Sequence, residues 1–227
     1  MDPVEEGYRN LWSMRTSPPV VTESWVDNDW SKGRTDYLTF LIRIDDVDII
    51  RRVSETQESL KAFSCADCFP PEYLHVTVKE TGCFLVEEPL NDDEFSSETL
   101  KDLIEEAKKA LEGVQGFEIE FKNINHFRSN IVVEARDDGS VREMNRRLMT
   151  LAGVQKQGYD YPKFLPHMSI CQFKSTDGYD EFINHLETKR QNNIGRVHVK
   201  HVDLVKAILP KKDRYPVLEP LTSFKLG

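Results

Sequence analysis

The feature that most constrains the fold is a four-residue pattern that occurs once in each half of the chain. Residues 75–78 are His-Val-Thr-Val and residues 167–170 are His-Met-Ser-Ile, so both copies read histidine, apolar, hydroxyl, apolar. Each copy lies in a segment, 74–81 or 164–173, whose alternation and apolar content predict a strand. The fold must therefore accommodate two similar strands that each bury one face.

The alternation along a strand places the polar residues of each copy together. Successive side chains point to opposite faces, so His75 and Thr77 share one face of the first strand, as His167 and Ser169 do on the second. If the two polar faces line a common cleft, two imidazoles and two hydroxyls converge on one ligand.

Strands and helices alternate along the rest of the chain, which predicts an α+β fold. A strand–helix–strand pattern occurs in each half, so we expect two lobes built from duplicated strand–helix–strand units around a central cleft. The other predicted strands are residues 37–44, 117–124, 131–135, 197–209 and 221–226, and the predicted helices are residues 46–60, 97–111, 141–151 and 177–189.

The chain divides into an N-terminal extension, residues 1–35, and a body, residues 36–227. The extension contains scattered proline and glycine without a clear period, and is predicted to be irregular. Its three tryptophans, Trp12, Trp25 and Trp30, argue against simple disorder. We expect the extension to pack back on the body, along the rim of a groove.

Charge and hydropathy exclude several classes of protein. A net charge of −9 argues against broad binding to nucleic acid or anionic membrane, but not against a local phosphate pocket. No stretch approaches the ~20 apolar residues of a membrane span, and the N-terminus lacks the basic start and apolar run of a secretion signal. We expect a cytoplasmic monomer with no membrane partner, with the nucleus as the alternative location.

The four cysteines are expected to be reduced thiols, because no secretion signal is evident. Cys65 and Cys68 form a lone CxxC, and Cys83 and Cys171 do not form the second pair that a structural zinc site usually needs. No carboxylate set suited to a metal is evident either. We predict no metal and no cofactor.

The paired histidines suit reactions at phosphorus. Such reactions need a base to deprotonate the nucleophile and an acid to protonate the leaving oxygen, and an ordinary imidazole pKa of about 6.5 serves both roles. Hydroxyls at Thr77 and Ser169 can donate hydrogen bonds to the non-bridging oxygens. About one His-x-Ser/Thr tripeptide is expected by chance in a chain of this composition. The evidence is therefore the occurrence of two, one on a predicted strand in each half. The alternative interpretation is two partly buried histidines bonded to neighbouring hydroxyls.

These motifs resemble those of the 2H phosphoesterase superfamily, which includes 2′-5′ RNA ligase-like proteins and RNA 2′,3′-cyclic phosphodiesterases. Residues 74–82 (LHVTVKETG) resemble its first motif, and residues 164–170 (FLPHMSI) its second. Residues 117–135 resemble the strand pair between the motifs, and residues 215–226 the closing segment. The resemblance spans roughly residues 37–226.

The resemblance implies roles for the motif residues. His75 and His167 carry over as the catalytic acid and base, in an order that the sequence does not reveal, and Thr77 and Ser169 as phosphate-binding residues. The family often has an arginine five positions after the second histidine, where this chain has Gln172.

Further residues are candidates for contacts with substrate. Lys79 shares the predicted polar face of His75, where it can reach a second phosphate of an RNA strand, although a solvated charge on the strand is the favoured interpretation. Cys171 shares the predicted face of His167 and is expected to line the pocket. The aromatic side chains of Tyr73, Phe127 and Tyr215 can stack on a base. For all three, packing in the core is an equally good interpretation.

The expected function is a metal-independent phosphodiesterase of RNA processing that acts on an RNA end or nucleotide 2′,3′-cyclic phosphate, yielding a 2′-phosphate, or on an RNA phosphodiester. One alternative is an oligonucleotide phosphodiesterase, either a 3′-exonuclease or an enzyme of 2′-5′ oligoadenylates. The other is a non-catalytic module that binds nucleotide or RNA.

Overall fold

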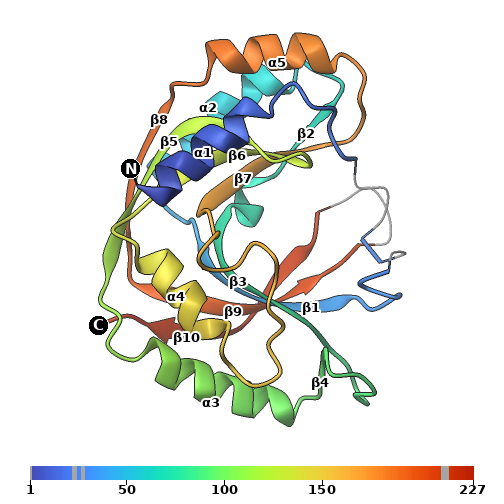
Figure 1. Ribbon diagram of the computed structural model, residues 1–227, viewed down its shortest axis with the longest axis vertical. Helices are drawn as coiled ribbons and strands as arrows, with labels where there is room; N and C mark the ends of the chain where they lie inside the picture. Colours follow the sequence, from blue (N-terminus) through green and yellow to red (C-terminus); the bar gives the residue numbers. More distant parts are fainter. Residues whose placement is uncertain (1, 22–24, 27–28, 211–214) are drawn as a thin grey trace.

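The computed structural model describes residues 2–21, 25–26, 29–210 and 215–227 (Figure 1). The described helices are α1 (Pro3–Ser13), α2 (Val47–Leu60), α3 (Thr99–Leu111), α4 (Ser140–Leu148) and α5 (Tyr179–Thr188), with a 3₁₀ turn, η1 (Pro71–Tyr73). The described strands are β1 (Asp36–Arg43), β2 (Ala66–Cys68), β3 (His75–Leu85), β4 (Glu94–Phe95), β5 (Phe117–His126), β6 (Asn130–Arg136), β7 (His167–Phe173), β8 (Asn193–Val199), β9 (His201–Ile208) and β10 (Val217–Lys225). Within these ranges, no helix is both long and apolar enough to cross a lipid bilayer.

The described strands belong to one sheet, and its two halves form the two lobes. The strand order is β10-β9-β1-β3-β7-β6-β5-β8, with β2 paired to β7 and β4 paired to β3 off this path. In Figure 1, β1, β9 and β10 lie in the lower half with α3 and α4, whereas α1, α2 and α5 lie in the upper half. This arrangement confirms the predicted two-lobed α+β fold.

The two strands that carry the histidine motifs are neighbours where the lobes join. In the described residues, β3 and β7 pair at one register position, Val76 opposite Met168. By contrast, β1 pairs with β3 from Tyr37 to Arg43. Because β3 and β7 run together so briefly, the sheet divides between them, and the cleft lies over this junction.

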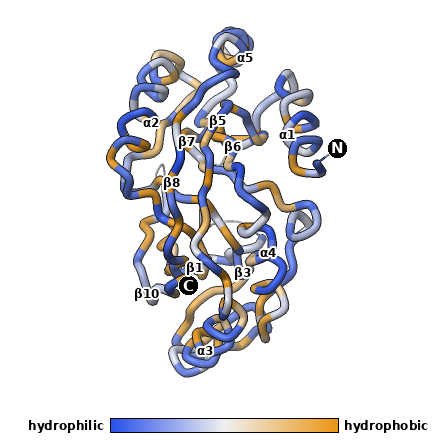
Figure 2. The backbone as a smooth tube through the Cα atoms, turned by 90° about the vertical axis from the view of Figure 1, so that its left-hand side faces the viewer, coloured by the Kyte–Doolittle hydropathy of each residue, from blue (hydrophilic) through white to orange (hydrophobic). Residues whose placement is uncertain are grey.

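Helices α2 and α4 connect the lobes, because each follows a strand of one lobe and packs against a strand of the other. Helix α2 follows β1 in the sequence but packs against β2, β7 and β8 of the other lobe. Helix α4 follows β6 but packs against β3 and α3. Figure 2, seen from the side, shows α2 and α5 at one end of the molecule and α3 at the other, each with mixed hydrophilic and hydrophobic colouring.

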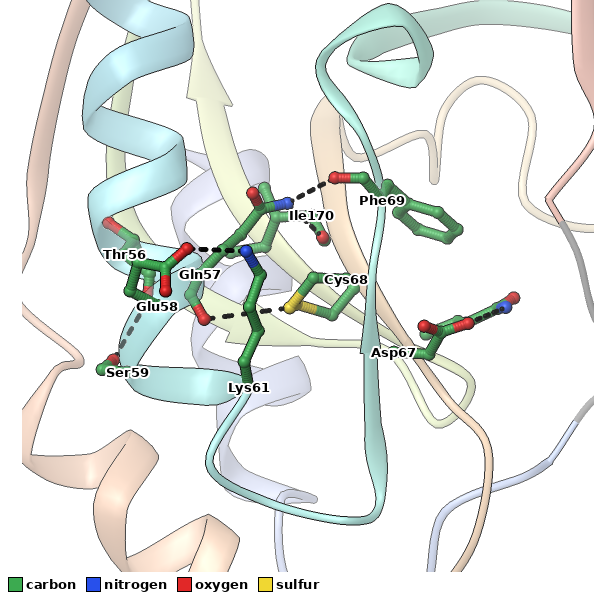
Figure 3. The surroundings of a disulfide bond; sticks show 11 residues. Thr56, Gln57, Glu58, Ser59, Lys61, Asp67, Cys68, Phe69 and Ile170 are labelled. Atoms are coloured by element: carbon green, nitrogen blue, oxygen red, sulfur yellow. Dashed lines mark hydrogen bonds and ion pairs between the residues drawn. A yellow bond between two sulfur atoms is a disulfide. The ribbon is translucent and has the colours of Figure 1, made fainter.

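Helix α2 illustrates how the sequence produces this packing. Its predicted cap is confirmed, because Asp46 accepts hydrogen bonds of 3.0 Å from the backbone N–H groups of Asp48 and Ile49. Its buried residues recur at helical spacing: Ile49, Val53, Gln57 and Leu60. The Gln57 amide satisfies two carbonyls, those of Phe69 and Ile170, at 2.8 Å each (Figure 3).

The N-terminal segment was predicted to be irregular, and for residues 3–13 this is wrong. Asp2 accepts from the backbone N–H of Val4 at 2.9 Å, and Pro3 occupies the first helical turn, where its missing N–H costs nothing. Tyr8 is 1% exposed, and its hydroxyl lies within hydrogen-bond reach of the carbonyls of Ala135 and Pro166. Helix α1 therefore contacts the residue immediately before His167.

The strand predicted for residues 197–209 is two strands. β8 pairs with β5 in one lobe, and β9 pairs with β1 and β10 in the other. The alternation continues across Lys200, so periodicity alone does not reveal that the chain changes lobes there.

The expectation of reduced thiols is also wrong for two of the cysteines. Cys68 on β2 lies opposite Cys171 on β7 in the strand register, and the two form a disulfide. Figure 3 shows the surroundings of Cys68. Cys65 and Cys83 are free and buried. Among the described residues, no group of three or more His, Cys, Asp or Glu side chains is placed to hold a metal ion.

Candidate active site

The cleft between the lobes brings the four motif side chains together. Since Val76 lies opposite Met168 in an antiparallel pair, His75 lies across from Ser169, and Thr77 across from His167. All four line one cavity of about 580 Å³. Directly opposed Cβ atoms are roughly 5 Å apart and diagonal ones roughly 7–8 Å, so the two imidazoles flank a space suited to one phosphate group.

Both histidines are oriented by the same backbone contact. His75 Nδ1 lies 2.6 Å from the carbonyl oxygen of Tyr73, and His167 Nδ1 lies 2.8 Å from that of Leu165. A carbonyl oxygen only accepts, so each Nδ1 is the protonated nitrogen. Each Nε2 is therefore left to exchange a proton with a ligand in the cleft.

Burial lowers the pKa of both imidazoles, because it disfavours the charged form. The pKa of His75 falls to about 4, with the contact to the Tyr73 carbonyl opposing the shift and the nearby His167 adding to it. The pKa of His167 is also lowered by burial, and the carbonyl of Leu165 opposes that shift. The free protein thus holds two neutral imidazoles at neutral pH.

Aromatic rings support both imidazoles. Tyr73 meets His75 edge-on, with ring centroids 5.0 Å apart, and Phe127 lies 4.5 Å from His167. Tyr73 lines the same cavity as the four motif side chains. Phe127 lines an adjoining cavity of about 340 Å³ that also contains Thr77 and His167. Tyr215 packs against Tyr73, with ring centroids 5.2 Å apart, and is not among the residues that line either cavity.

Lys79 was predicted to face the cleft with His75, and this is wrong. A β-bulge at Val78 shifts the register, because Thr77 and Lys79 oppose the consecutive residues Leu41 and Phe40. The Lys79 side chain is consequently 0% exposed, and its ammonium group donates to Asp160 at 2.7 Å and to the Gln155 carbonyl at 2.9 Å. Lys79 therefore holds the loop 152–166 in place and does not face a substrate in the cleft.

A matching bulge on β7 overturns the prediction for Cys171. Ser169 and Cys171 oppose the consecutive residues Val132 and Ile131, so Ile170 is the extra residue. Cys171 turns away from the cleft and pairs with Cys68. Gln172, at the position where the family often has arginine, donates to Asp67 at 3.2 Å.

The bulge on β3 brings a residue into the cleft that the sequence analysis missed. Glu80 takes the place predicted for Lys79, and it lines both cavities together with Tyr159. The Tyr159 hydroxyl donates to the Glu80 carboxylate. Burial raises the pKa of Glu80, although this hydrogen bond opposes the shift. No sequence signal marks either residue. Tyr159 lies in a loop without periodicity, and Glu80 lies beyond a bulge that the alternation does not reveal.

Other polar groups complete the adjoining cavity. Ser129, in the turn before β6, and Asn130, the first residue of β6, line both cavities, and Lys163 lines the smaller one. Lys163 is a cation at the margin of a site that carries two hydroxyls and two neutral imidazoles. The whole arrangement can bind a phosphate group and move a proton on each side of it.

Comparisons with known proteins agree with this geometry. The family model of the 2′-5′ RNA ligase superfamily matches residues 46–208. E. coli LigT, solved in complex with NADP+, has a TM-score of 0.62 at 14% identity, covering 85% of this chain and 98% of that chain. The protein TT0787 of Thermus thermophilus has a TM-score of 0.59 at 20% identity, covering 84% of this chain and 97% of its own.

A third solved structure, the conserved protein of unknown function ATU0111 from Agrobacterium tumefaciens, has a TM-score of 0.58 at 11% identity, covering 94% of this chain and 98% of its own. No curated protein matches the chain. At these identities the structural likeness shows the fold, and the family model shows the family. The chain belongs to the 2′-5′ RNA ligase superfamily, the 2H phosphoesterases that its two histidine motifs predicted.

Proposed function

We propose that this protein is a phosphodiesterase that opens 2′,3′-cyclic phosphates at RNA ends or on nucleotides, with His75 and His167 as acid and base. The observation that carries the proposal is the paired arrangement of the two imidazoles. Each has Nδ1 held by a carbonyl, and both line one cavity with Thr77 and Ser169. A site that only binds phosphate has no need of two groups that exchange protons.

In the proposed reaction, water attacks phosphorus while Nε2 of one neutral imidazole accepts a proton from it. The P–O bond to the ribose 3′-oxygen breaks, and Nε2–H of the other, protonated imidazole donates a proton to that oxygen. The product is a 2′-phosphate and a free 3′-hydroxyl. Thr77 and Ser169 donate hydrogen bonds to the non-bridging oxygens as negative charge builds up. The reverse reaction exchanges the roles of the two histidines.

The proposal has support from the relative that shares the fold. Crystal structures of E. coli LigT contain phosphate and 3′-AMP. The cleft described here has the residue types to bind the same groups, with hydroxyls for phosphate and aromatic rings for a base.

The test is turnover of a 2′,3′-cyclic nucleotide beside short 3′-5′ and 2′-5′ oligonucleotides, with products separated by chromatography and identified by ³¹P NMR. We expect a 2′-phosphate from the cyclic substrate, and no product with His75→Ala or His167→Ala. Turnover of the linear oligomers alone would identify an oligonucleotide phosphodiesterase. Nucleotide binding without any turnover, unchanged in both variants, would identify a binding module.

A further inference from the structure

The far end of the main cavity is formed by the N-terminal segment, outside the residues that the family model matches. Trp25, Asp29, Trp30 and Lys32 line the cavity that also contains His75 and His167. The family match begins at residue 46. This end of the cleft therefore lies outside the family match, and the two-histidine reaction gives it no role.

Trp30 is part of an aromatic platform, which we define as Trp30, Tyr37 and Phe84. The centroid of the Trp30 ring lies 5.3 Å from that of Tyr37 and 5.4 Å from that of Phe84, and Tyr37 lies 5.2 Å from Phe84. Phe84 is 1% exposed, whereas Trp30 remains 44% exposed. The platform thus has a buried base and an indole surface that a ligand in the cleft can contact.

Hydrogen bonds and ion pairs hold the platform in place. Arg34 donates to the Trp30 carbonyl at 2.8 Å and to the Ser31 carbonyl at 2.9 Å. The same guanidinium group forms a two-pronged contact of 2.8 and 2.9 Å with Asp93 and another of 2.9 Å with Glu94. It also lies 4.1 Å over the Phe84 ring. A surface fixed in this way binds without a large ordering cost.

The platform lies well away from the reacting phosphate. Phe84 follows Thr77 by seven residues on β3, and a strand rises about 3.3 Å per residue, so the two are on the order of 20 Å apart along the strand. A ligand that contacts both the histidines and the platform must be longer than one nucleotide.

From this placement we propose that Trp30 stacks on a base upstream of the reacting end, so that the preferred substrate is an oligonucleotide rather than a mononucleotide. The inference rests on the proposed function, since it assigns the reacting phosphate to the histidine pair. Every base has a face that stacks on indole, so we expect little base preference at this position. Asp29 and Lys32 both line this end, so stacking rather than charge supplies the affinity.

The test compares kcat/KM for a 2′,3′-cyclic mononucleotide with that for a dinucleotide, trinucleotide and tetranucleotide that carry the same cyclic end. We expect the wild type to gain efficiency with length, mainly through a lower KM. Trp30→Ala should remove roughly 5- to 150-fold of kcat/KM for the longest substrate relative to the mononucleotide, the range known for loss of one stacked base. Trp30→Phe should restore most of it.

Leu90→Ala serves as the matched control, because Leu90 is an exposed apolar residue, 86% accessible, that does not line the cleft. It should leave the length dependence unchanged. If wild-type turnover is independent of length, the inference is overturned while the proposed function stands. If no cyclic phosphate is turned over, calorimetric affinities of the same series decide: a gain with length that Trp30→Ala abolishes supports the platform, and equal affinities overturn it.

Discussion

The reassignment of Lys79 from substrate contact to loop anchor leads to a prediction about stability. Lys79 and Asp160 are both 0% exposed and form an ion pair at 2.7 Å. Asp160 also accepts from the backbone N–H of Gln157 at 2.7 Å and from the Asn145 amide at 3.0 Å. Lys79→Met removes the ammonium group but keeps an unbranched side chain of similar length. The Asp160 carboxylate then remains buried without a counter-charge.

The size of the effect follows from that burial. Removing one partner of a buried ion pair typically costs about 3–5 kcal/mol, because the remaining charge is desolvated without compensation. For a domain of this size, 1 kcal/mol corresponds to about 2–4 °C, so Tm should fall by roughly 6–20 °C. In the double variant Lys79→Met/Asp160→Asn the stranded charge is gone, and much of the loss should be recovered.

Urea unfolding of the two single variants and the double variant, analysed as a double-mutant cycle, measures the coupling directly. Lys61→Met is the matched control, because that lysine is 52% exposed and its pair with Glu58 is a surface contact. It should change stability by less than about 0.5 kcal/mol. If Lys79→Met kept wild-type stability but raised KM for a nucleotide several-fold, Lys79 would be a substrate contact and the reasoning would be refuted.

The remaining predictions concern the site and its supports. His75→Ala and His167→Ala should each lower kcat by about 10²–10⁴-fold with little change in the circular dichroism spectrum, and Thr77→Ala and Ser169→Ala should lose less; near-wild-type turnover in either histidine variant would contradict the assignment. Burial lowers the pKa of His75 to about 4 and that of His167 below 6.5, so the protonated imidazole that the reaction needs accumulates only as pH falls below 6.5. The pH optimum of kcat/KM should lie below 6.5, and an optimum on the alkaline side would be incompatible with it. Because these folded-state pKa values lie below the unfolded value, stability should also decline as pH falls from 6.5 toward 4, as urea midpoints across that range would show. Thiol labelling of the denatured, unreduced protein should modify two cysteines, Cys65 and Cys83, since the other two form a disulfide. Reduction should then lower stability by about 4–5 kcal/mol, because the disulfide closes a loop of about 100 residues, and four labelled cysteines would show that the disulfide is absent.

The central residues of the site could be predicted from the sequence because their signal is local. His75 and Thr77 are two apart on a strand, as are His167 and Ser169, and the period of two placed each pair on one face. The pairing of the two strands could not be read from that period. It depends on the register of Val76 with Met168, which is a tertiary contact.

The wrong predictions for Lys79 and Cys171 share a physical cause, because each residue directly follows a β-bulge at the last position of a motif. Val78 and Ile170 are β-branched residues well suited to a regular strand, so nothing in the sequence marks either as an extra residue. Beyond each bulge the faces exchange. Lys79 and Cys171 turn into the core, and Glu80 enters the cleft.

The helix at the N-terminus is a different case, because its signal was present. Asp2 and Pro3 form a cap and first turn, and Glu5 and Glu6 favour the positive end of a helix dipole. The prolines and glycines that follow outweighed this signal. Tyr159, by contrast, has no local sequence signal, because it lies in a loop whose position depends on the buried pair of Lys79 and Asp160.

The account depends most on the two imidazoles binding one phosphate together. Ring ¹⁵N NMR of the wild-type protein, titrated with inorganic phosphate and assigned with His75→Ala and His167→Ala, tests this directly. We predict that the Nε2 signals of both histidines shift along one binding curve with a single dissociation constant, while both Nδ1 atoms stay protonated. Two different dissociation constants, or a response from only one ring, would show that the histidines do not share a phosphate.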